Sequence, residues 1–338
     1  MPLGFLTRLT LGPRRGNPLL VFGLGVVLSG LIETCQIFLP GRFASPIDVT
    51  NNSLGALLGA LLLEGIEHRI QLTPGMVDRL ALELPMMGLP YLLVPLLWVS
   101  SFASRNQPGR WVLTTFIGFV GAGVLSSVHR HRFGPAGAIS ASGTALVAAL
   151  GFLVGAFPGF VVNPGLLALS TTAVALVTGL LSMIPGRTGT GDRRFEAAEL
   201  NRIIPAFLLY LLLLAVWPPT PDSARWTPEW GLVPELDHVS TDEVMSLLEY
   251  IAGFTLLGYA LAARRGRREE PTGILVSRTA LLGAACAGLL ELASAFHAGS
   301  RGSGLRLAMS IVAAGYGARL YAAQRAHIRN VLWAGRES

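Results

Sequence analysis

Polar side chains gather in one short stretch of an otherwise apolar chain. Glu33 and Gln36 stand three positions apart, and Asp48 and Asn52 stand four positions apart. Each spacing places its two residues on one face of a helix, and Arg42 lies between the two pairs. Two carboxylates, two amides and a guanidinium can hold a phosphate or sugar headgroup, with the guanidinium on the anion and the amides on hydroxyls.

Two glycines extend the second polar face. Gly55 and Gly59 follow Asn52 in steps of three and four, so they share its side of the helix. Small residues at this spacing let two membrane helices approach closely. We expect this contact to bring Asn52 and Asp48 against Glu33 and Gln36 across a helical hairpin.

The same residues permit four interpretations. Ionisable residues inside membrane spans favour a binding site. A structural staple, in which Glu33 pairs with Arg42, is the alternative because polar groups in lipid need partners in any case. A membrane enzyme would use Glu33 or Asp48 as a general base, but no nucleophile motif or phosphate loop accompanies them. A transporter is a further alternative, although the central spans lack charged midplane residues.

The elements that must position the motif are membrane helices. The apolar share is 51%, charged residues are 14% and the mean hydropathy is +0.55, which indicates a bilayer as the solvent. Ten apolar runs can cross about 30 Å of hydrocarbon. They lie at 18–38, 51–66, 81–103, 110–128, 137–158, 165–185, 203–217, 246–263, 278–297 and 305–323. We expect an all-α, polytopic transmembrane bundle of about ten spans.

The arginines predict its orientation. All 26 basic residues are arginine, and with residues 1–17 in the cytoplasm 20 of them fall inside and 6 outside. The positive-inside rule therefore predicts an N-in, C-in topology. Because topology explains the net charge of +6, we do not expect nucleic acid as a partner.

A second copy of the hairpin is predicted near the other end of the chain. A shift of 258 positions places Glu33 on Glu291 and Ser45 on Ser303. Further identities pair Gly30 with Gly288, Leu31 with Leu289, Phe38 with Phe296, Gly41 with Gly299, Gly59 with Gly317 and Ala60 with Ala318. An acidic residue within an apolar helix is rare, so matching one twice favours a duplication.

This second copy departs from the motif where charge matters. Arg306 stands at the position of Asp48, and Arg42 has only the neighbouring Arg301 as a counterpart. Reversal of the charge predicts an ion pair between Glu291 and Arg306. We therefore expect Glu291, Arg301 and Arg306 to be structural.

The motif resembles a known family. It reads Glu33-x-x-Gln36, Pro40-Gly41-Arg42, Ser45, Asp48-x-x-x-Asn52-x-x-Gly55-x-x-x-Gly59. This pattern is similar to the VanZ family, membrane proteins named for a component of glycopeptide-resistance clusters. The resemblance covers about 18–66 and, in degenerate form, 203–323, but not 81–185. It implies a bacterial plasma (inner) membrane protein linked to envelope stress or teicoplanin-type tolerance, with membrane lipid or a lipid-linked envelope precursor as partner.

These patterns divide the chain into five segments. They are a VanZ-like hairpin at 1–70, a four-span apolar middle region at 71–186, a cytoplasmic linker at 187–202, a degenerate four-span unit at 203–325 and a cytoplasmic tail at 326–338. Two spans precede the hairpin of the second unit, whereas only residues 1–17 precede the first. We expect the first unit to lack two spans, either because this copy is short or because its start is placed too far downstream.

The remaining polar residues receive simple interpretations. Glu249 is expected at the membrane interface, and His129 and His131 in a cytoplasmic turn. No cysteine, histidine or acidic spacing predicts a metal, and no cofactor is expected. The oligomeric state is left open.

Overall fold

The structure is a computed structural model of the chain. It describes residues 4, 7, 17–36, 45–69, 74–105, 107–132, 140–184, 194–217, 227–231, 241–265, 270–298 and 300–334. Within these ranges the protein is all-α, apart from two strands of two residues each.

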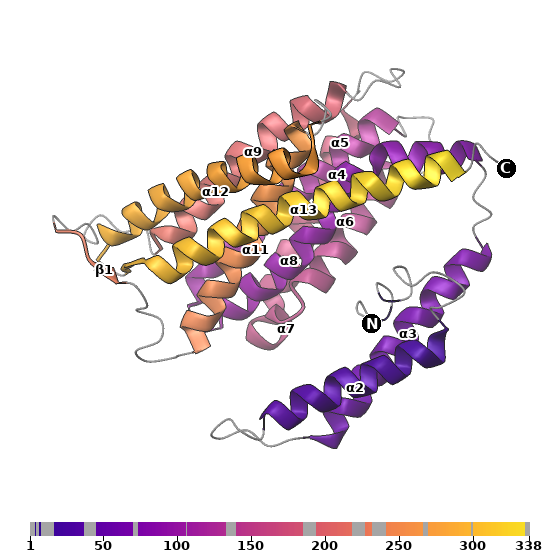
Figure 1. Cartoon of the computed structure of the whole chain (residues 1–338), viewed down its shortest axis with the longest axis horizontal. Coiled ribbons are helices and arrows are strands. Elements are labelled where there is room, and N and C mark those ends of the chain that lie inside the picture. Colours follow the sequence, from indigo (N-terminus) through magenta and orange to yellow (C-terminus); the bar gives the residue numbers. More distant parts are fainter. Residues whose placement is uncertain are drawn as a thin grey trace. The chain divides into compact units, whose positions relative to one another are not determined.

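Each of the ten apolar runs coincides with a long helix (Figure 1). The helices are α2 (Pro18–Gln36), α3 (Pro46–Arg69), α4 (Pro74–Ala103), α5 (Trp111–Arg132), α6 (Ala141–Gly155), α8 (Pro164–Met183), α9 (Arg194–Ala215), α11 (Thr241–Arg265), α12 (Thr272–Ala295) and α13 (Gly304–Ala334). Shorter elements are η1 (Pro108–Arg110), α7 (Gly159–Val162), β1 (Trp230–Gly231) and β2 (Gly302–Ser303). α9 begins at Arg194, within the segment expected as a linker at 187–202.

Helix length and composition make this a membrane protein. Among the described residues, five helical stretches are long and apolar enough to span a bilayer: Pro108–His131, Pro164–Met183, Ala198–Ala215, Glu243–Arg265 and Thr272–Ala295. Three shorter apolar stretches lie at Pro18–Thr34, Gly88–Ala103 and Ala141–Gly155. Large apolar side chains remain exposed on α2, α8 and α12. Such surfaces are stable when lipid tails, rather than water, surround them.

The chain forms two compact units, Met1–Val77 and Asp78–Ser338. In the first unit α2 packs against α3 where Gly25 lies opposite Ala56. A Cβ atom added at Gly25 would lie 3.1 Å from the Cβ atom of Ala56. Gly4 also lies against the backbone of Ala56. Small residues therefore set the distance between the helices of this unit.

In the second unit α13 runs beside α11 and α12 (Figure 1). Gly258 of α11 lies against the backbone of Ala314, and Gly317 of α13 lies against the backbone of Thr255. A Cβ atom at either glycine would come within 2.0 Å of a carbonyl oxygen, so the two backbones are in direct contact. α9 contacts α5, α11 and α12, and thereby joins the middle and C-terminal regions.

We predict that Gly317→Leu destabilises this unit by about 3 kcal/mol or more, because overpacking against backbone forces the helices apart. Thermal unfolding in detergent would measure the effect. Gly288→Leu is the matched control, since no atom lies within 4 Å of a Cβ atom at Gly288. Equal unfolding temperatures for the two variants would contradict the contact.

Candidate functional site

Glu33 organises the start of α3 in the N-terminal hairpin. Its side chain is buried, with 6% of the residue exposed, and its Oε2 atom accepts the backbone N–H of Ser45 at 2.7 Å. Ser45 Oγ in turn accepts the N–H of Asp48 at 3.4 Å, as an N-capping serine does. Asp48 is exposed in the first turn of α3, where the helix dipole favours a negative charge.

Asn52 connects the two helices one turn further in. Its Nδ2 atom donates to Ser29 Oγ at 3.0 Å. Ser29 lies four residues before Glu33, so the two share one face of α2. The structure thus places Asn52 on the expected face of the hairpin, with Ser29 rather than Glu33 as its partner.

The remaining motif residues are described only in part. The side chain of Gln36 and all of Arg42 lie outside the described residues. Gly59 is buried and Gly55 is half-buried in α3. The sequence analysis did not predict that Gly25 contacts Ala56 across the hairpin. Gly23 and Gly25 both lie in α2, and the sequence alone does not indicate which of the two faces α3.

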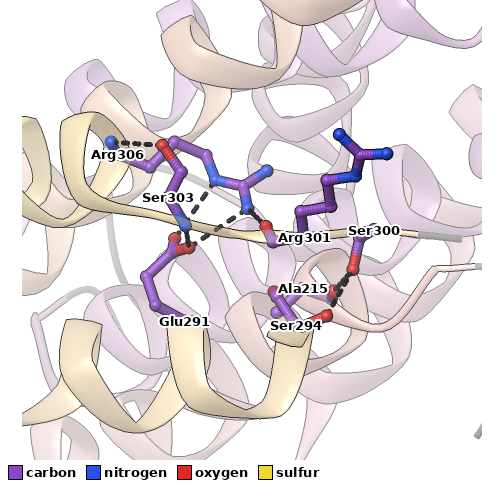
Figure 2. A network of polar contacts seen from close by, with 7 residues as sticks. All are labelled: Ala215, Glu291, Ser294, Ser300, Arg301, Ser303 and Arg306. Atoms are coloured by element: carbon purple, nitrogen blue, oxygen red, sulfur yellow. Dashed lines mark hydrogen bonds and ion pairs between the residues drawn. The ribbon is translucent and has the colours of Figure 1, made fainter. Parts of the chain in front are cut away.

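The C-terminal hairpin has the same hydrogen bonds at positions shifted by 258. Figure 2 shows the residues of this hairpin. Glu291 is 1% exposed, and its Oε2 atom accepts the N–H of Ser303 at 2.7 Å. Ser303 Oγ accepts the N–H of Arg306 at 3.2 Å. Both hairpins therefore hold the start of their second helix through a buried glutamate and a serine.

The two hairpins differ in the neutralisation of this glutamate. Arg306 donates from Nε to Glu291 Oε1 at 3.2 Å and from its NH2 group to Oε2 at 3.1 Å (Figure 2). The guanidinium also lies over the ring of Tyr250, 5.2 Å from its centroid. The structure contains the ion pair expected between Glu291 and Arg306, in the two-pronged geometry that makes such pairs strong.

A strand covers the connection between α12 and α13. The N–H of Glu229 donates to Ala295 O, and the N–H of Gly302 donates to Glu229 O, each at 2.9 Å. β1 and β2 pair in parallel through Trp230 and Gly302. Arg301 Nε lies 3.0 Å from the Glu229 carboxylate in an exposed ion pair. Arg301 therefore contacts the residue that precedes β1 at the protein surface.

A second buried ion pair was not expected from the sequence. Glu249 is 0% exposed and pairs with the buried Arg110, while the hydroxyl of Tyr210 donates to Glu249 at 3.5 Å. Glu249, expected at the membrane interface, is thus buried within the protein. The middle region, expected to be apolar, supplies Arg110 to this pair. No local signal could identify a partner 139 residues away.

The two histidines, expected in a turn, lie in a helix. His129 and His131 lie in the last turns of α5, which ends at Arg132. His129 is buried and its Nδ1 atom is 2.7 Å from Thr144 Oγ1. The described residues contain no group of three His, Cys, Asp or Glu side chains that could hold a metal ion.

We predict that Arg110→Ala costs about 3–5 kcal/mol of stability, because it leaves the Glu249 carboxylate buried and unpaired. Thermal unfolding of the detergent-solubilised protein would measure it. Glu229→Ala removes half of an exposed ion pair and should cost only about 0–1 kcal/mol. Similar losses of stability in the two variants would show that burial does not determine how much each ion pair contributes to stability.

Comparison with known proteins identifies the N-terminal hairpin. A family model described as VanZ/LLP1 matches residues 1–67. The match does not reach the second copy expected at 203–323, which stays a prediction. No curated protein and no solved structure matches the chain. The segment at residues 1–67 is therefore similar to the VanZ/LLP1 family.

Proposed function

We propose that the N-terminal hairpin binds a cell-envelope or lipid-linked ligand at the outer leaflet, through Glu33, Gln36, Arg42, Asp48 and Asn52. The observation that carries the proposal is the buried Glu33 carboxylate, held at the end of α2 by the Ser45 N–H. A carboxylate away from water is costly unless a cation and hydrogen bonds compensate it.

The two hairpins differ in the charged residue in the first turn of their second helix. Arg306 neutralises Glu291 in the C-terminal hairpin, whereas the corresponding first-turn residue of α3 is Asp48. The N-terminal hairpin thus carries two carboxylates where the C-terminal hairpin carries one ion pair. In our proposal, Arg42 of the connection between the helices pairs with these carboxylates when no ligand is bound.

The ligand chemistry follows from this balance. A phosphate can attract Arg42 away from the carboxylates, while Glu33 and Asp48 accept hydrogen bonds from sugar hydroxyls. The amides of Gln36 and Asn52 add donors and acceptors. A lipid-linked phosphate or sugar combines these groups with a membrane anchor, so it suits a site at the end of a membrane helix.

The proposed location is a bacterial plasma (inner) membrane, crossed about ten times with both termini inside. Contacts between distant helices support this topology, because helix ends that it assigns to the same side of the membrane contact each other. Arg110 and Glu249, both assigned to the outer side, form one pair, and Arg130 and Glu199, both assigned to the inner side, lie 4.0 Å apart. The VanZ-like segment supports a role in envelope stress or teicoplanin-type tolerance.

We predict that Arg42→Ala weakens binding of a long-chain polyprenyl phosphate by about tenfold or more, because the phosphate loses its cation. Native mass spectrometry of delipidated protein with added lipid would measure it. Arg301→Ala is the control, because Arg301 lies in the C-terminal hairpin and is exposed. It pairs there with Glu229. Unchanged binding in Arg42→Ala would overturn the assigned site.

The topology has a separate test. In a Cys35→Ser, Cys286→Ser background, a cysteine at Asp222 should react with a membrane-impermeant maleimide in intact cells, because 218–245 is assigned outside. A cysteine at Ser338 should react only after permeabilisation. Labelling of the Ser338 position in intact cells would contradict the N-in, C-in topology.

A further inference from the structure

A buried polar cluster lies where α4, α5, α9 and α11 reach the side assigned to the outer face. Glu249 of α11 pairs with Arg110, and the Tyr210 hydroxyl of α9 donates to the same carboxylate at 3.5 Å. Ser100 of α4 and Thr114 of α5 share a hydrogen bond of 3.1 Å. The Nε–H of Arg110 is buried without an acceptor among the described residues. Buried donors are usually satisfied by water, so water can enter this end of the helices.

A second buried polar cluster lies at the opposite ends of the same four helices. The carboxylate of Glu199, on α9, lies 4.0 Å from the guanidinium of Arg130, on α5. Glu196, three residues before Glu199, is also buried. The hydroxyl of Tyr259, on α11, lies against Gly88 of α4. The Nε–H of Arg130 is likewise buried, with no acceptor in the described part of the chain, so water can enter this end too.

Apolar side chains separate the two clusters. They line a void of about 10 Å³ between the four helices. Each helix contributes to the lining, with Leu93 of α4, Val124 of α5, Phe207 of α9 and Leu257 of α11 among the residues. On α9, Phe207 lies between Glu199 and Tyr210, which are about 16 Å apart along the helix. The polar ends are therefore joined by a short apolar segment.

The size of this void restricts what can cross it. About 10 Å³ is the space that one water molecule needs. Apolar cavities are otherwise dry, and an apolar constriction closes a path by excluding water. Ions other than protons must pass as bodies of their own, whereas a proton needs only a chain of hydrogen-bonded water molecules. The void therefore suits a proton and excludes larger solutes.

We infer that these four helices form a gated path for protons between the two polar clusters. Buried ion pairs alone specify which helices meet, but that role does not require buried carboxylates at both ends of the same helices. Carboxylates within spans commonly mark proton pathways. A proton that enters near Glu249 crosses when water briefly wets the void, and one proton leaves near Glu199. Only O–H bonds are exchanged, and a counter-ion in the membrane balances the charge.

This function lies in the C-terminal unit and does not depend on the ligand proposed for the N-terminal hairpin. Proteoliposomes of the full chain, loaded with a pH-sensitive dye, test it, with potassium and valinomycin supplying the counter-ion. We expect an imposed pH gradient to decay about tenfold or more faster than in protein-free vesicles, while trapped carboxyfluorescein is retained. Equal decay with and without protein overturns the inference, and so does escape of the trapped dye.

Two variants change the void in opposite directions. Ala260 lines the void and is 3% exposed, so Ala260→Leu fills it and should return the decay to the protein-free rate. Leu257→Asn holds water in the void and should speed the decay about tenfold or more. The matched controls are Ala285→Leu on the exposed side of α12 and Leu248→Asn, which is 39% exposed on α11. Both controls should leave the decay unchanged.

Glu199→Gln removes the inner proton acceptor with little change in packing, and should slow the decay about tenfold or more. Glu270→Gln is its control, because Glu270 pairs with Arg278 outside the four helices. Thermal unfolding identifies any variant that fails to fold, and the remaining variants then decide. If Ala260→Leu, Leu257→Asn and Glu199→Gln, when folded, all behave like their controls, the path through the void is overturned.

Discussion

Each hairpin depends on one hydrogen bond between a buried carboxylate and a backbone N–H. Glu33 accepts from Ser45, and Glu291 accepts from Ser303, both at 2.7 Å. The serine hydroxyl then accepts the N–H three residues on, so the carboxylate orients the residue that caps the next helix. Near the hydrocarbon region of a membrane, water cannot readily replace a lost partner of this bond.

The same shortage of water explains the ion pairs of the C-terminal unit. Arg306 compensates Glu291, and Arg110 compensates Glu249. Arg306 also lies over Tyr250, the residue next to Glu249, so the two pairs are neighbours. They involve α11, α12, α13 and η1, which directly precedes α5, and therefore join the middle region to the C-terminal hairpin. Buried pairs of this kind specify which helices meet more than they add stability.

Sequence patterns predicted features that depend on local spacing. Hydropathy placed a helix at every expected span, and the reversal from Asp48 to Arg306 predicted the partner of Glu291. Features that depend on distant partners could not be predicted. Glu249 resembled an interfacial residue because nothing near it in the sequence pointed to Arg110. The partner of Asn52 was likewise missed, because the register between α2 and α3 depends on the close approach of Gly25 and Ala56.

The contrast between the hairpins explains why only one is assigned a ligand. Arg306 in the first turn of α13 opposes the helix dipole, and its position is favourable only because it grips Glu291. That pair is complete without any added group. Asp48 in α3 is instead favoured by the dipole and leaves the neutralisation of Glu33 to groups outside the helix. In the site that we propose, a cation on the connection moves to a ligand phosphate, whereas Arg306 is fixed in the helix beside its carboxylate. Under this proposal, the change from arginine to aspartate at one position distinguishes a binding site from a structural ion pair.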